Sequence, residues 1–154
     1  MDIAEVLKHT SPDLFLPELQ ATDKAGVLAE LVEGLVTGTP TITKPDAVLQ
    51  MLESREALGS TAVGPGVAFP HGRTLAVQKL TVLIARSSAG VDFDSMDGEK
   101  THLFFVLIAP PQDSGHKYIK SLAALTDALQ DDARRQGLRD ADDYDAFCAV
   151  LGGE

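Results

Sequence analysis

Two apolar runs limit most strongly the folds that this chain can adopt. They are "LTVLIAR", residues 80–86, and "THLFFVLIAP", residues 101–110. Both are rich in β-branched or aromatic residues and show little alternation between apolar and polar positions, which is typical of central strands covered on both faces. We therefore expect a buried sheet at the centre of the fold. Shorter strands are predicted at "DLFL" (13–16) and "GVAF" (66–69).

Segments with helical spacing of apolar residues precede the two runs. One begins at Thr22 and carries Gly34 and Gly38 near its expected end. A second follows Thr43, which can cap the helix through its hydroxyl group, and Pro45 suits its first turn because that position needs no N–H donor. The sequence thus predicts two helices before the central strands.

Three more helical segments follow the second apolar run. They are the segment after the loop "PPQDSGHK" (110–117), "DDARRQGL" (131–138) and "DADDYDAFCAVL" (140–151). The first has an apolar stripe composed of Tyr118, Ile119, Leu122, Leu125 and Leu129. Strands interleaved with helices predict an α/β fold, a three-layer α/β/α sandwich with a mixed central β-sheet flanked by helices. A chain of 154 residues with 44% hydrophobic content is expected to form one domain, residues 1–154.

Composition excludes several classes of ligand and location. The formal net charge of -10 argues against nucleic acid or anionic lipid as the main partner, because both reward clustered Lys and Arg. The single cysteine, Cys148, excludes an intramolecular disulfide and fits a reducing compartment. The N-terminus lacks the pattern of a secretory signal, and no apolar run approaches the length of a membrane span. We expect a cytoplasmic protein without direct membrane insertion.

One window of this acidic chain is basic. Between residues 55 and 86, Arg55, Arg73, Lys79 and Arg86 stand against Glu56 alone, which gives 4 minus 1, or +3. An anion approaching this segment meets less repulsion than it meets elsewhere on the chain.

The basic window contains an unusual frame around one histidine, "GPGVAFPHGRT", residues 64–74. Its glycines permit positive φ angles and close backbone approach, so successive N–H groups can turn toward an anion. Pro65 and Pro70 restrict the backbone before His71. The frame therefore predicts a rigidly placed imidazole, and the alternative is a tight hairpin with His71 at its tip.

Other signatures of chemistry are missing from the sequence. It contains no GxxxxGK[ST] loop, no complete dinucleotide-binding glycine pattern and no GxSxG elbow. The four histidines, His9, His71, His102 and His116, show neither an HExxH pattern nor paired spacing. We therefore expect neither a metal nor a cofactor.

The segment "SREALGSTAVGPGVAFPHGR" resembles the active-site segment of the enzyme IIA domains of the bacterial sugar phosphotransferase system, in the fructose, mannitol and nitrogen-regulatory branch. The similarity extends through "VDFDSMDGEKTHLFFVLIAP" and the closing helices, nearly end to end. The resemblance implies that His71 accepts a phosphoryl group from the phosphohistidine of the carrier protein HPr or a paralogue. It then passes the group to an enzyme IIB domain or reports the phosphorylation state as a nitrogen-type regulator.

The resemblance also implies roles for the neighbours of His71. Arg55 matches an arginine beside the phosphorylated imidazole, where a forked cation stabilises phosphoryl oxygens. Thr61 is expected to donate a hydrogen bond from its hydroxyl group, and Gly66 from its backbone N–H. Without the resemblance, Arg55 reads as a solvated charge that complements the C-terminal dipole of its helix.

The chain departs from the family pattern at the position of a second histidine. Aligning the helix after the last strong strand puts Tyr118 there, with His116 two residues before it. His116 can reach in from the loop, or Tyr118 can replace the histidine with a neutral phenol that binds phosphate through a hydrogen bond. We favour Tyr118, whose other interpretation is core packing in the helical stripe.

The substitution motivates a second functional hypothesis, a regulatory binding module that senses an anion or partner in the same pocket without phosphoryl transfer.

Overall fold

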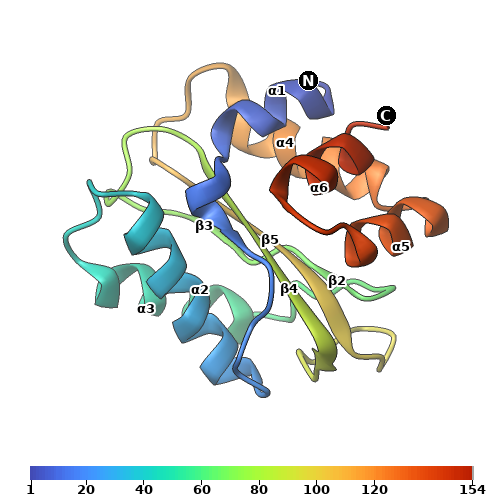
Figure 1. Cartoon of the computed structure of the whole chain (residues 1–154). Coiled ribbons are helices and arrows are strands. Elements are labelled where there is room, and N and C mark those ends of the chain that lie inside the picture. The colour runs from blue at the N-terminus through green and yellow to red at the C-terminus, as the bar shows by residue number, and fades with distance from the viewer. Residues whose placement is uncertain (154) are drawn as a thin grey trace.

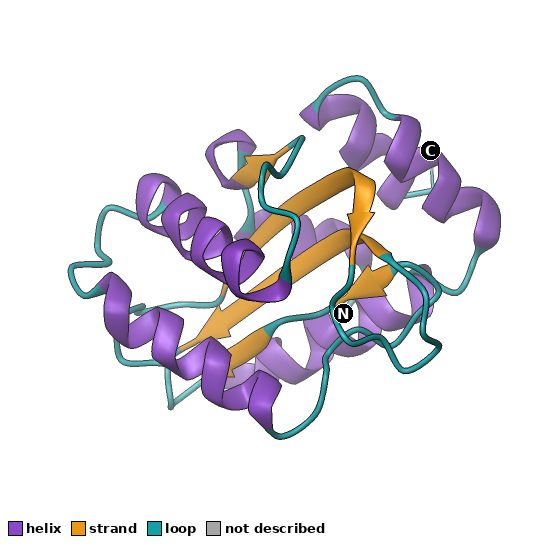
Figure 2. Ribbon diagram, turned by 90° about the horizontal axis from the view of Figure 1, so that it is seen from below, coloured by secondary structure: helices purple, strands orange, loops and turns teal. Residues whose placement is uncertain are grey.

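A mixed sheet forms the centre of the computed structural model, which describes residues 1–153. Its strands are β1 (Phe15–Leu16), β2 (Val67–Ala68), β3 (His71–Arg73), β4 (Thr81–Val91) and β5 (Thr101–Ala109). The strand order is β1-β4-β5-β2, and β3 also pairs with β5. Figure 2 shows the strands lying between helices. β4 runs antiparallel to β5, whereas β2 and β3 run parallel to β5 and β1 runs parallel to β4. The two long apolar runs are therefore the neighbouring central strands.

Helices cover both faces of the sheet, so the predicted three-layer sandwich is confirmed (Figure 1). One face carries α2 (Lys24–Gly38) and α3 (Pro45–Ala57). The other carries α1 (Ile3–Val6), α4 (Lys117–Ala128), α5 (Asp132–Asp140) and α6 (Tyr144–Leu151). Short 3₁₀ helices connect these elements at η1 (Leu7–His9), η2 (Pro12–Leu14) and η3 (Ser114–His116). Among residues 1–153, no helix is both long and apolar enough to cross a bilayer.

Strand β5 explains the lack of apolar alternation in the sequence. Phe104 and Val106 pack with the core beneath α2 and α3, while Phe105 and Leu107 pack with the core beneath α4 and α6. All four side chains are fully buried. Since successive side chains of a strand point to opposite faces, a strand buried on both faces must be apolar at every position.

The starts and ends of two helices differ from the prediction. Helix α3 begins at Pro45, so its N-cap residue is Lys44 rather than Thr43, and no side chain caps the helix there. The predicted Thr43 cap is therefore wrong, because the helix begins one residue further along, whereas Pro45 occupies the first turn as expected. In α2, Gly34 lies inside the helix and only Gly38 marks its end.

The stripe of α4 is confirmed except at one residue. Tyr118, Leu125 and Leu129 are buried, but Ile119 is 57% exposed. Consecutive helical residues are rotated by about 100°, so Ile119 turns to solvent when Tyr118 turns to the core.

The short strands are smaller than predicted, and one was missed. Pro12–Leu14 forms a 3₁₀ turn, so only Phe15–Leu16 of "DLFL" is a strand. After Val67–Ala68, the chain returns to the sheet at His71–Arg73, parallel to β5. The hairpin that would place His71 at a tip is therefore wrong.

Gly72 of β3 lies directly against the side chain of Met51 in α3. A Cβ atom on Gly72 would lie 1.9 Å from Sδ of Met51, a side chain of α3. Arg55 lies one helical turn after Met51 and therefore on the same side of α3. The absence of a side chain at Gly72 thus lets α3 bring Arg55 close to the strand of His71.

We predict that Gly72→Ala lowers the free energy of unfolding by about 1–3 kcal/mol, because overpacking forces Met51 or the helix to move. Urea denaturation measures this loss. The matched control is the double variant Gly72→Ala/Met51→Ala, in which the alanine should cost less than it costs beside Met51. An equal cost in both backgrounds would show that the contact with Met51 is not the cause.

Candidate functional site

His71 begins β3 opposite Leu107 of β5, and its ring is half-buried. Nδ1 of the ring lies 2.6 Å from the carbonyl oxygen of Phe69. A carbonyl oxygen can only accept a hydrogen bond, so Nδ1 carries the proton. In the neutral ring, Nε2 then holds a lone pair and can act as a nucleophile. The backbone two residues earlier therefore fixes the tautomer of His71.

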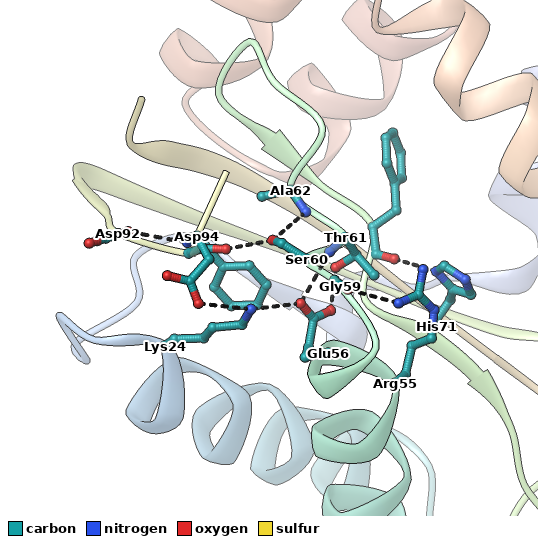
Figure 3. A network of polar contacts seen from close by, with 12 residues as sticks. Lys24, Arg55, Glu56, Gly59, Ser60, Thr61, Ala62, His71, Asp92 and Asp94 are labelled. Atoms are coloured by element: carbon teal, nitrogen blue, oxygen red, sulfur yellow. Dashed lines mark hydrogen bonds and ion pairs between the residues drawn. The ribbon is translucent and has the colours of Figure 1, made fainter. Parts of the chain in front are cut away.

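Arg55 lies in the last turn of α3 and is half-buried. Its Nη1 donates a hydrogen bond to the carbonyl oxygen of Gly59 at 2.8 Å. Figure 3 shows the Arg55 side chain directed toward the His71 ring. The structure thus brings together the two residues that the sequence analysis placed at the centre of the site.

Tyr118 of α4 approaches the same imidazole from the opposite side of the sheet edge. The ring centroids of His71 and Tyr118 lie 6.0 Å apart. Burial raises the pKa of the Tyr118 phenol above its usual value, and the charges of Arg73 and Arg55 oppose this shift only in part. Tyr118 therefore stays neutral near pH 7. His116 is exposed and has a left-handed backbone just before α4, so the geometry favours Tyr118 as the neighbour of His71.

Arg73 is a site residue that the sequence analysis did not assign. Its guanidinium carbon lies 4.7 Å from the centroid of the Tyr118 ring, and its Nη1 donates to the carbonyl oxygen of Pro110 at 3.2 Å. The sequence "HGR" contains the information needed to place Arg73 beside His71, because residues two apart in a strand point to the same face. It could be used only once residues 71–73 were known to form a strand.

Two predicted phosphate ligands have other contacts. Thr61 is buried, and its hydroxyl group donates to a carboxylate oxygen of Glu56, so its proton is already committed. The carbonyl oxygen of Gly66 accepts the N–H of His102 at 2.9 Å, at the far end of β5 from His71. Gly66 and His71 are separated by five residues of extended chain, or roughly 16 Å. Gly66 thus lies well away from His71 along the edge of β5, and its role as a phosphate ligand stays a prediction.

The assembled site can bind an anion and attack it. Two permanent cations, Arg55 and Arg73, lie around a nucleophilic imidazole nitrogen and a neutral phenol. Guanidinium groups match the oxygens of a phosphoryl group, and a positioned nucleophile needs little further machinery to attack its phosphorus. Across residues 1–153, no three His, Cys, Asp or Glu side chains cluster as metal ligands.

Comparisons with known proteins agree with this geometry. The family model described as "Phosphoenolpyruvate-dependent sugar phosphotransferase system, EIIA 2" matches residues 8–153. A nitrogen regulatory protein of Bradyrhizobium diazoefficiens is 38% identical over 92% of this chain and 90% of its own length. The fructose-specific EIIA component of Haloferax volcanii is 33% identical over 98% of this chain and 97% of its own. The crystal structure of nitrogen regulatory protein IIA-Ntr from Neisseria meningitidis superposes with a TM-score of 0.87, at 25% identity, covering 96% of this chain and 99% of that one.

We predict that the phenol of Tyr118 ionises above pH 10, because burial disfavours the charged phenolate. The difference between the ultraviolet titrations of the native chain and Tyr118→Phe isolates this group from Tyr144, whose pKa burial raises to about 12.

The sign of the effect on stability follows from linkage. Above pH 10 the unfolded chain loses the Tyr118 proton while the folded chain keeps it, so the free energy of unfolding falls as pH rises. Tyr118→Phe should show a smaller fall. A phenol that titrates at pH 10 or below would contradict the buried placement.

Proposed function

Because the chain belongs to the EIIA 2 family of the phosphoenolpyruvate-dependent sugar phosphotransferase system, we propose that it is a phosphoryl carrier whose acceptor is His71. The observation that supports this proposal most directly is the contact of Nδ1 with the carbonyl oxygen of Phe69. It leaves Nε2 unprotonated in the neutral ring and therefore able to accept a phosphoryl group.

The transfer step needs no group beyond the residues already described. The Nε2 lone pair attacks the phosphorus of the donor's phosphohistidine as the bond between that phosphorus and the donor nitrogen breaks. The donor imidazole takes the electron pair, and one phosphoryl group moves. Positive charge then develops on the His71 ring, and the Phe69 carbonyl stabilises it through the Nδ1 proton. Arg55 and Arg73 offset the negative charge of the phosphoryl oxygens.

The donor proposed for this step is the phosphocarrier HPr or a paralogue. The recipient is an enzyme IIB domain or, in a nitrogen-type role, a regulatory target protein. The names of the similar proteins include both roles, since one is a nitrogen regulatory protein and another is a fructose-specific component. Both roles begin with the same acceptance of a phosphoryl group at His71.

Exposed apolar side chains next to the site residues suit the docking of a protein donor. Leu58, Leu75 and Ile119 are 85%, 89% and 57% exposed, and each lies within three residues of Arg55, Arg73 or Tyr118 along the chain. Apolar side chains around a polar centre are typical of protein-binding surfaces.

We predict that incubation with a phosphorylated HPr-type donor adds one phosphoryl group to the native chain and none to His71→Ala. Intact mass measured at neutral or alkaline pH detects the addition, because a phosphoramidate is labile in acid. His102→Gln should label like the native chain, since the His102 Nδ1 contacts the carbonyl oxygen of Ser87, away from the site. A native chain that keeps its mass beside a competent control protein would end the proposal.

We predict that Arg73→Gln and Arg55→Gln each slow labelling on the order of tenfold or more, because each removes a cation from the phosphoryl oxygens. A stopped time course of intact mass measures the rate. His116→Gln should label at close to the native rate because its side chain is exposed. If His116→Gln slowed labelling more than Tyr118→Phe does, His116 would be the second partner of the phosphoryl group.

One observation favours a second function, a regulatory binding module without phosphoryl transfer. Tyr118 gives the site a neutral phenol in place of a second imidazole, so no second group can accept positive charge near neutral pH. The same labelling experiment separates the two functions. A binding module would bind its partner equally with and without a phosphoryl group, and His71→Ala would not change that binding.

A further inference from the structure

A buried carboxylate, that of Glu56, lies next to Arg55 in the chain and has no part in the proposed transfer step. Glu56 follows Arg55 in α3, and its side chain is only 4% exposed. Its Oε1 lies 3.0 Å from Nζ of Lys24 and accepts the backbone N–H of Thr61 at 3.1 Å. Its Oε2 accepts the hydroxyl group of Thr61. A buried charge is stable only when paired and hydrogen-bonded, and Glu56 meets both conditions (Figure 3).

The segment held by Glu56 pairs with the segment that leads to His71. Ala62 and Ala68 form an antiparallel bridge. On either side of it, Phe69 N–H donates to the Thr61 carbonyl at 3.1 Å, and Val63 N–H donates to the Val67 carbonyl at 3.2 Å. Thr61 and Phe69 therefore lie opposite each other at a hydrogen-bonded position of the ladder. In a regular antiparallel ladder, two such residues form two hydrogen bonds with each other.

The pair forms only one of these two bonds. The missing bond would run from the Thr61 N–H to the Phe69 carbonyl oxygen, but that N–H donates to Glu56. The Phe69 carbonyl oxygen accepts from Nδ1 of His71 at 2.6 Å. The acceptor that fixes the tautomer of His71 is thus the one that the incomplete pair leaves available.

We propose that Glu56 is a positioning residue: its carboxylate withdraws the Thr61 N–H from the strand pair and so leaves the Phe69 carbonyl to the Nδ1 proton of His71. The inference rests on the proposed role of His71 as phosphoryl acceptor. Lys24 supports the arrangement by neutralising Glu56, and it also lies 3.4 Å from Asp94 and over the ring of Phe93. One helix end therefore supplies both a cation for the phosphoryl group, Arg55, and the group that orients the nucleophile, Glu56.

The test replaces the buried pair as a unit. The variant Lys24→Met/Glu56→Met removes the acceptor without leaving a buried charge alone, and such replacements by apolar residues of similar size commonly preserve folding. The Thr61 N–H can then donate to the Phe69 carbonyl oxygen. That oxygen has two lone pairs, so the new hydrogen bond weakens the one from Nδ1 of His71 and with it the preference for the Nδ1 tautomer. Glu56→Gln is the conservative variant, because it keeps one side-chain oxygen for the Thr61 N–H.

Nitrogen chemical shifts of the His71 imidazole, measured by nuclear magnetic resonance, report the tautomer without any phosphoryl donor. The native chain and Glu56→Gln should show the proton on Nδ1, whereas the double variant should show a mixture of tautomers. Labelling by the phosphorylated donor should slow on the order of tenfold in the double variant, because the nucleophile is misplaced. Asp94→Asn, which removes the exposed partner of Lys24, should match the native chain in both measurements.

The two measurements separate this inference from the proposed function. A folded double variant that keeps the proton on Nδ1 would overturn the inference, whatever its labelling rate. A native chain that shows the Nδ1 tautomer but accepts no phosphoryl group would overturn the proposed function. The positioning role of Glu56 would then be tested by the tautomer measurement alone.

Discussion

The burial of β5 on both faces and along both edges is the constraint on which the rest of the structure depends. This strand pairs with β4 on one side and with β2 and β3 on the other, and it separates two apolar cores. Its register sets the position of His71, which lies opposite Leu107. The helices on one face deliver Arg55, and α4 on the other delivers Tyr118. The site exists because two layers meet at the same strand edge.

Two backbone features then determine the chemical properties of this position. Gly72 lets α3 lie against β3, and the Phe69 carbonyl orients the imidazole. Neither of these two contacts requires a polar side chain of the site other than His71. The side chains that remain, two guanidinium groups and one phenol, can all face a group bound at the imidazole.

The sequence predicted what depends on local pattern and missed what depends on pairing. The two long strands were predictable because a strand covered on both faces is apolar throughout, and the frame around His71 was visible in its glycines and prolines. The contacts of Gly66 and Thr61 were not predictable, because they follow from the register along β5 and from the buried Glu56. Arg73 was missed for the same reason, since three residues are too few for a period of two to show a strand.

Under the proposed function, a phosphoryl group at this edge would change the electrostatic field of the molecule, because the edge already carries two guanidinium groups. The chain carries a net charge of -10, and two of its cations, Arg55 and Arg73, lie near the ring of Tyr118 beside His71. A phosphoryl group on His71 would bring nearly two negative charges at pH 7, about as much as the two arginines neutralise. The loaded and empty forms would therefore present different electrostatic fields to an approaching protein even if no backbone atom moved. Discrimination between the two forms would need no conformational switch.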